Sequence, residues 1–97
     1  MATRNVRTRE FRDLFARLPL DLRELAKSAY RTFLRHPDHP SLRHHALADM
    51  ARGRHRVGSW SVSITMKYRA VYAVDGDTNV WYWIGSHNAY ENFVGTK

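Results

Sequence analysis

Cysteine is absent from this chain of 97 residues, so a disulfide framework, a thiolate nucleophile and a cysteine-bound zinc are all excluded. Long apolar runs are absent too: the longest, residues 80–84, is far shorter than the roughly 20 residues that span a bilayer. The basic N-terminus lacks the apolar stretch of a signal peptide. We therefore expect residues 1–97 to form one domain that works in the reducing cytoplasm, away from membranes.

Acidic residues are scarce relative to basic ones. The chain has 16 Lys and Arg against 9 Asp and Glu, which gives a net charge of +7. The whole excess lies in residues 1–56, because residues 57–97 hold three residues of each sign. Such a balance is expected for a protein with a polyanionic partner, either nucleic acid or an acidic protein, but also for a protein that is simply soluble.

The first half of the sequence predicts two amphipathic helices. The first begins after Thr8, a good N-cap, and ends at Pro19. Its apolar residues recur with helical spacing: Phe11, Leu14, Phe15 and Leu18. The second begins at Asp21 and ends before Pro37, because a residue that precedes proline disfavours the helical conformation. The short turn between them predicts an antiparallel helical hairpin, and residues 1–7 are expected to be a loose arm.

The second half changes to a period of two, which is typical of strands. In residues 59–66, serine or threonine alternates with Trp60, Val62, Ile64 and Met66. A tight connection around Lys67 leads to a strand at residues 68–74, and the Asp-Gly-Asp turn at residues 75–77 leads to a third strand at residues 80–85. Residues 42–47 fit either a short strand or a turn of helix. Ser86 is expected to cap a last helical turn that runs through Asn92 and ends near Gly95.

The predicted fold class is α+β, with the N-terminal helical hairpin packed on one face of an antiparallel sheet of three or four strands. The other face would then be free for function. In the third strand, strict alternation places Trp81 and Trp83 on one face and Val80, Tyr82 and Ile84 on the other. Because the helices cover only one face, large apolar groups would be exposed on the other, and such groups usually mark a partner surface.

The order and spacing of these segments resemble the RelE/ParE toxin superfamily. In that superfamily a strand leads through a turn into a Tyr-Arg-x-x-Tyr strand, which resembles residues 59–72 here (SWSVSITMKYRAVY). The next strand ends on a functional residue, as residues 80–87 (VWYWIGSH) do. Upstream, residues 11–19 and 29–42 are similar to a subgroup of the same superfamily.

This resemblance implies the toxin component of a bacterial type II toxin–antitoxin system. RelE-like and YoeB-like members cut mRNA on the ribosome without a metal ion or cofactor, which would make the chain an mRNA endoribonuclease. ParE-like members instead inhibit DNA gyrase without catalysis, and a degenerate member would only bind its antitoxin. The implied partners are a cognate antitoxin and, for the ribonuclease, mRNA and the ribosome.

The resemblance also implies catalytic residues. A metal-free ribonuclease must take a proton from the ribose 2′-hydroxyl, stabilise charge on the phosphorane and protonate the leaving 5′-oxygen. Arg69 matches the YoeB-like arginine that stabilises charge on the phosphorane, and His87 matches the histidine that protonates the leaving group. The other interpretations are a structural ion pair for Arg69 and a strand-end cap for His87. The YoeB-like glutamate that acts as base has no match, because residues 40–45 hold histidines where an acid is expected.

RelE-like members work with basic residues and a tyrosine instead. The candidates here for contacting RNA are Arg43, Arg52, Arg54, Arg56, Lys67 and Tyr90. Residues 52–56 are equally consistent with a solvated loop, and Tyr90 with packing of the last helical turn. Histidines 36, 39, 44 and 45 lie close in sequence, but neither a carboxylate nor a cysteine completes a zinc tetrahedron, so no metal site is predicted.

The face of the sheet that Arg69 occupies depends on the connection around Lys67. A connection of three residues places Arg69 on the face of Ser63 and Thr65, whereas two residues place it on the apolar face, against the helices. Only the first arrangement leaves Arg69 available for catalysis.

Overall fold

The computed structural model describes residues 4–47 and 55–95, which form a five-stranded sheet with helices on both faces. The strands are β1 (Arg4–Arg7), β2 (His45–Ala46), β3 (Ser59–Thr65), β4 (Tyr68–Asp75) and β5 (Thr78–Ser86), and their order across the sheet is β1-β5-β4-β3-β2. The helices are α1 (Arg9–Ala16), α2 (Leu20–Arg35), α3 (His87–Val94) and the short 3₁₀ turn η1 (Pro40–Leu42). The α+β class is confirmed. None of the helices in the described ranges has the length and apolar character needed to cross a membrane.

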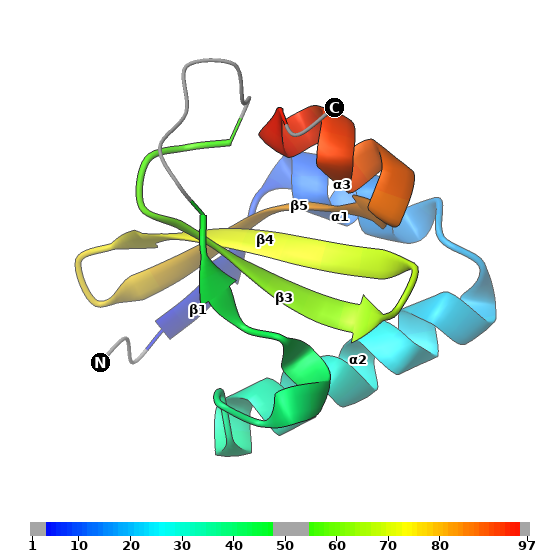
Figure 1. The fold of residues 1–97 in the computed structure, drawn as a ribbon, viewed down its shortest axis with the longest axis horizontal. Helices are drawn as coiled ribbons and strands as arrows, with labels where there is room; N and C mark the ends of the chain where they lie inside the picture. The colour runs from blue at the N-terminus through cyan, green and yellow to red at the C-terminus, as the bar shows by residue number, and fades with distance from the viewer. Residues whose placement is uncertain (1–3, 48–54, 96–97) are drawn as a thin grey trace.

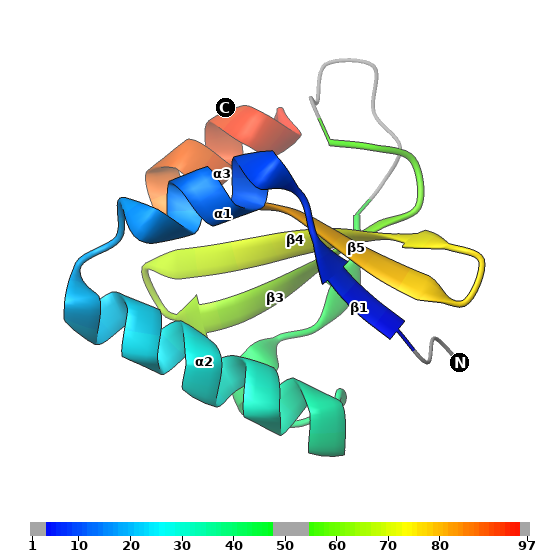
Figure 2. The ribbon, with the colours of Figure 1, turned by 180° about the vertical axis from the view of Figure 1, so that it is seen from behind.

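The two N-terminal helices form where the apolar periodicity predicts them. The Thr8 hydroxyl accepts a hydrogen bond from the Phe11 amide at 3.1 Å, which caps α1. The start of α2 differs from the expectation, because Pro19 is its N-cap and Asp21 lies inside the first turn. Figure 2 shows α1 and α2 in front of the sheet, diverging from the turn that joins them. There α1 packs on β5 and α2 packs on β3, so the two helices cover one face.

The expectation of a loose arm at residues 1–7 is wrong for residues 4–7, which form β1 and pair in parallel with β5. Asn5 ties this strand to the sheet, because its side-chain oxygen accepts hydrogen bonds from Trp81 Nε1 at 2.9 Å and from Asn79 Nδ2 at 3.2 Å. A strand of four largely polar residues has no apolar alternation by which to recognise it. With β2, which occupies part of the ambiguous segment 42–47, the sheet has five strands rather than three or four.

A β-bulge in β3 sets the face on which Arg69 lies. The turn between β3 and β4 holds only Met66 and Lys67, since Thr65 pairs with Tyr68. In a regular hairpin that short turn would place Arg69 opposite Ile64, on the face of α1 and α2. The register instead shifts between Ser63 and Thr65, so that Arg69 pairs with Ser63. One extra residue in β3 therefore returns Arg69 to the face opposite α1 and α2.

A second bulge, in β5, corrects the expected placement of the tryptophans. Val71 pairs with Trp83, whereas Tyr72 pairs with Trp81, so Tyr82 is the extra residue. Trp81 consequently packs under α1 and α2, while Tyr82 and Trp83 pack on the other face. Trp81 and Tyr82 are buried and Trp83 is half-buried. The predicted surface of exposed aromatic residues therefore does not exist on β5.

The face opposite α1 and α2 is partly covered by α3, not left free as expected. Figure 1 shows α3 lying along β4 and β5. Ser86 caps this helix by accepting a hydrogen bond from the Ala89 amide at 3.2 Å, and Gly95 ends it with φ 79°, so both predicted ends are confirmed. Tyr90, Phe93 and Val94 form the buried side of the helix.

Candidate functional site

Arg69 lies on β4, the central strand of the sheet, close to the β3–β4 turn and on the face that α3 partly covers. Its neighbours in the adjacent strands are Ser63 in β3 and Gly85 in β5. One guanidinium nitrogen donates a hydrogen bond to Ser63 Oγ at 2.8 Å, and the guanidinium carbon is 5.0 Å from the centre of the Tyr90 ring. Arg69 Nε is buried and has no hydrogen-bond partner within the described part of the chain. The structure thus holds this cation half-buried between a hydroxyl and an aromatic ring.

Gly85 leaves room for the indole ring of Trp83 beside Arg69. A Cβ built on Gly85 would lie 2.9 Å from two ring carbons of Trp83, which is too close for any larger residue unless the ring moves. Trp83 in turn stacks on Phe93 of α3 with ring centres 4.8 Å apart. The glycine therefore allows the aromatic packing that holds α3 against the sheet beside Arg69.

His87 is the first residue of α3 and lies at the same end of the sheet. Its amide donates to the carbonyl of Lys67 at 2.6 Å, which ties the helix to the β3–β4 turn. Its ring lies nearly parallel to the Tyr90 ring, with centres 6.4 Å apart. Arg69 and His87, the two predicted catalytic residues, therefore both lie against the ring of Tyr90.

The His87 ring is held by a carboxylate that the sequence analysis did not single out. Its Nε2 atom is 2.6 Å from Oε1 of Glu91, one helical turn further along α3. The side chain of His87 is 42% exposed and that of Glu91 is 25% exposed, so the pair borders solvent. The spacing of four residues on a predicted helical turn was the available signal for this contact.

Tyr90 is buried, as expected if it packs the last helix against the sheet. It is 7% exposed and packs in the α3 core with Phe93 and Val71. The ring is covered by the protein and supports the Arg69 guanidinium, so it is not placed to stack on a base in this conformation. This burial favours the packing interpretation of Tyr90, and its role as an RNA contact stays a prediction.

The other predicted RNA-binding residues separate into two groups. Arg43 and Lys67 are exposed and adjoin the β3–β4 turn, where the guanidinium of Arg43 contacts the sulfur of Met66. Arg43 has φ 44°, a left-handed conformation that is uncommon outside glycine and often marks functional sites. Arg56 lies elsewhere, with its guanidinium 4.5 Å from the centre of the Tyr82 ring. Arg52 and Arg54 lie outside the described residues.

Neighbouring histidines before and within β2 lie on opposite faces. His44 Nε2 forms a hydrogen bond of 2.7 Å with the Tyr72 hydroxyl, on the side of α2. Burial lowers the pKa of His44 below its ordinary value, and burial raises the pKa of Tyr72 to about 12. His45 pairs with Ser61 and therefore lies on the face of Arg69. No three His, Cys, Asp or Glu side chains of the described ranges gather closely enough to hold a metal ion.

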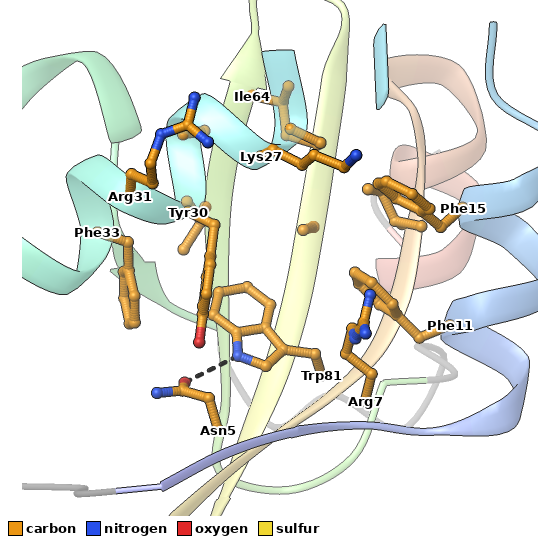
Figure 3. Close-up of a pocket in the computed structure, with 15 residues that line it drawn as sticks. Asn5, Arg7, Phe11, Phe15, Lys27, Tyr30, Arg31, Phe33, Ile64 and Trp81 are labelled. Atoms are coloured by element: carbon orange, nitrogen blue, oxygen red, sulfur yellow. Dashed lines mark hydrogen bonds between the residues drawn. The ribbon is translucent and has the colours of Figure 1, made fainter. Parts of the chain in front are cut away.

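A groove separates α1 from α2 on the opposite face of the sheet. It encloses a cavity of about 440 Å³ whose floor includes Val62, Ala70 and Trp81. Figure 3 shows aromatic rings from both helices turned toward Trp81, with basic side chains at the rim. The cations that line it are Arg7, Lys27 and Arg31, and none of the lining residues is acidic. The groove is thus apolar inside and positive at its edge.

Fold and site together define a small α+β protein with a cationic, histidine-containing site on one face and an apolar groove on the other. No protein-family model matches the chain, and no curated protein does. Solved structures do match it. One is the YoeB/ParE toxin from Agrobacterium tumefaciens, at 24% identity, which covers 88% of this chain and 99% of that one with a TM-score of 0.65.

Two further matches are more distant in sequence. YafQ from E. coli strain BL21(DE3) is 10% identical, with 89% of this chain and 94% of that one covered and a TM-score of 0.68. A chain of the RelB–RelE antitoxin–toxin complex from Methanococcus jannaschii is 13% identical, with 91% and 96% covered and a TM-score of 0.61. The chain therefore shares its fold with these solved toxin structures.

Proposed function

We propose that this protein is the toxin of a bacterial type II toxin–antitoxin system and acts in the cytoplasm as a metal-independent endoribonuclease on ribosome-bound mRNA. The observation that carries the proposal is the meeting of Arg69 and His87 on one face of the sheet, both against Tyr90. The cations Arg43 and Lys67 adjoin the same end of the sheet. The fold shared with YoeB/ParE, YafQ and RelE supports the same class.

In this proposal each residue has a role that its surroundings permit. Arg69 binds the scissile phosphate, because a planar guanidinium can donate to two phosphate oxygens at once and stabilise charge as it develops. His87 donates a proton to the leaving 5′-oxygen, since an imidazole both gives and takes protons near neutral pH. In the free protein Glu91 occupies His87 Nε2, so an entering RNA oxygen would replace the carboxylate there. Arg43 and Lys67 contact neighbouring phosphates.

A cognate antitoxin is the proposed protein partner, as in the RelB–RelE complex. The groove between α1 and α2 suits an amphipathic helix with acidic flanks, because its floor is apolar and its lining cations carry the opposite charge. Exposed Tyr30, whose ring packs edge-on against Trp81 at 6.1 Å, would lie at the centre of that contact. The groove takes the place of the exposed β5 aromatic residues that the sequence analysis predicts as a partner surface.

The test is inducible expression in bacteria, with mRNA 5′ ends and DNA breaks mapped after induction. Growth arrest with new mRNA ends is expected for the wild type, and both effects should disappear in Arg69→Ala and His87→Ala. Arg35→Ala and His36→Ala are matched controls, because both side chains are exposed at the far end of α2 and should leave cleavage unchanged. DNA breaks with intact mRNA would instead identify a gyrase inhibitor, and absence of arrest would contradict toxicity altogether.

A further inference from the structure

His44 connects the segment before β2 to the apolar face of the sheet. Its ring is half-buried among three aromatic rings, with ring centres 4.8 Å away for Trp60, 5.5 Å for Phe33 and 5.8 Å for Tyr72. Its Nε2 atom also forms a hydrogen bond of 2.7 Å with the Tyr72 hydroxyl, and Tyr72 is 4% exposed. A single polar contact inside an aromatic enclosure therefore attaches this segment to the central strand β4.

Arg43, the residue before His44, has a backbone conformation that needs support from its neighbours. Its φ of 44° is left-handed, and a residue with a side chain stays in that region only where the surrounding structure holds it there. On one side the Arg43 amide donates to the Pro40 carbonyl at 3.2 Å, and on the other side His44 is fixed to the sheet. In this conformation the Arg43 guanidinium reaches Met66 in the β3–β4 turn.

The direction of the bond between His44 and Tyr72 follows from the other ring nitrogen of His44. A hydrogen bond with the backbone of Pro37 favours the protonated ring. Proline has no backbone N–H, so the imidazole donates in that bond and carries its proton on that nitrogen. In the neutral ring Nε2 is then an acceptor, and the Tyr72 hydroxyl donates to it. Burial raises the pKa of Tyr72 to about 12, so this hydroxyl keeps its proton at neutral and acidic pH.

Protonation of His44 removes the match between donor and acceptor. An imidazolium has two N–H donors and no acceptor, so Nε2 would face the Tyr72 hydroxyl donor to donor, or leave the buried hydroxyl proton without an acceptor. Burial lowers the pKa of His44, and Asp38 opposes this shift, while His45 adds to it and the Pro37 carbonyl opposes it. The bond therefore belongs to the neutral ring and is lost on acidification.

We infer that the His44–Tyr72 bond is a pH-sensitive switch that positions Arg43 for contact with RNA, an inference that rests on the proposed ribonuclease function. His44 is a positioning residue, because it lies on the face of α2 and acts only through Arg43. At neutral pH the bond holds Arg43 beside the β3–β4 turn. As the pH falls through the pKa of His44, the ring leaves its enclosure and Arg43 relaxes from the left-handed conformation. The site then loses one cation for the phosphates of RNA.

The switch itself is measured first, on the full chain without RNA. Two-dimensional NMR follows the Arg43 amide and the Trp60 indole from pH 8 to pH 4.5. Both signals should shift with one common midpoint below 6.5, the ordinary pKa of histidine. His44→Gln should abolish the transition, since its amide oxygen still accepts from the Tyr72 hydroxyl but does not titrate. His36→Gln is the matched control, exposed at the end of α2, and should keep the transition.

The effect on RNA is measured with a short RNA whose 2′-hydroxyls are all methylated, so that it binds without being cleaved. Arg43→Ala should weaken its binding roughly tenfold at pH 8, because a charge-assisted hydrogen bond to phosphate is lost. In the wild-type background this difference should nearly vanish at pH 4.5. In the His44→Gln background it should persist at both pH values, since Arg43 stays in place.

The outcomes separate the switch from the function on which it rests. An Arg43→Ala effect that is equal at both pH values in the wild-type background would overturn the switch. An effect that vanishes on acidification in the His44→Gln background too would assign the pH dependence to another group, and so would an Arg43 signal that titrates in that variant. Binding and switching without any cleavage of mRNA would contradict the ribonuclease function alone. A wild-type protein that binds no RNA would overturn the role of Arg43 and this inference with it.

Discussion

The two faces of the sheet differ in the polarity of the side chains that line them. The face under α1 and α2 is apolar, with Val62, Ala70 and Ile84 buried beneath Phe11 and Phe33. The face under α3 combines aromatic rings with polar groups, since Ser59, Ser61 and Ser63 are all buried there. Burial of the apolar side chains is favourable by itself, whereas each buried polar group on the α3 face needs a hydrogen-bond partner. One face mainly supports the fold, and the other can hold charged groups in place.

The α3 face shows how a cation is positioned without a facing carboxylate. A row of rings, Tyr90, Trp83, Phe93 and Tyr82, runs along it with neighbouring centres 4.8 to 6.2 Å apart. Arg69 lies over the first ring and Arg56 over the last. Aromatic faces attract guanidinium groups and are rigid, so they fix the cation while leaving its outer nitrogens for a ligand. The apolar face has no equivalent arrangement among the described residues.

Truncation on the apolar face should produce the largest loss of stability. Phe33 is 6% exposed and contacts the rings of His44, Tyr72 and Trp81. Phe33→Ala should lower the free energy of unfolding by about 3–5 kcal/mol, since it removes a large ring and leaves a cavity. Urea denaturation measures the effect. A loss below about 1 kcal/mol would mean that this face is not the main core.

A change on the α3 face should cost less stability but reach the site. Gly85→Ala places a methyl group against Trp83, which must move, and the expected cost is about 1–3 kcal/mol. Because Trp83 adjoins Tyr90, which supports Arg69, the rate of the proposed RNA cleavage should fall as well. Phe33→Ala, assayed at a temperature where it is folded, is the comparison and should retain cleavage. Equal effects of both variants on cleavage would contradict the division between the faces.

Acidification should weaken the apolar face through His44. Burial lowers the pKa of His44 below 6.5, so the unfolded chain binds its proton more readily than the folded chain. His44 therefore contributes stability above pH 6.5 that is lost as the pH falls through its lowered pKa. The free energy of unfolding should drop more between pH 8 and pH 5 for the wild type than for His44→Gln, whose amide can still bond to Tyr72. Parallel pH dependences would exclude His44 as the cause.

The smallest predicted effect has the opposite sign. Ser61 Oγ is buried on the α3 face and has no hydrogen-bond partner within the described part of the chain. Ser61→Ala removes this unsatisfied group and should raise the free energy of unfolding by about 1 kcal/mol. Ser63→Ala is the matched control and should be destabilising, because Ser63 accepts a hydrogen bond from Arg69. A loss of stability in Ser61→Ala would indicate that Ser61 has a partner such as water.

Much of the fold was predictable because its signals are local. The start of α1 follows from Thr8, and the ends of α3 follow from Ser86 and Gly95, since caps depend only on residues one turn away. The apolar side of β3 follows from strict alternation over its length. Arg69 and His87 were identified as a pair through the family resemblance, and the structure brings both to Tyr90.

The sequence alone could not predict features that depend on contacts between residues far apart in the chain. Strand β1 forms because it pairs with β5 and because the Asn5 side chain accepts a hydrogen bond from Trp81. No pattern within residues 4–7 predicts this strand. The faces of Arg69 and Trp83 depend on two bulges, each a single extra residue that reverses every side chain beyond it. Helix caps and apolar periodicity are therefore determined by residues that are close together in the sequence. The register across strands, and with it the meeting of Arg69 and His87 beside Tyr90, depends on how distant segments pack together.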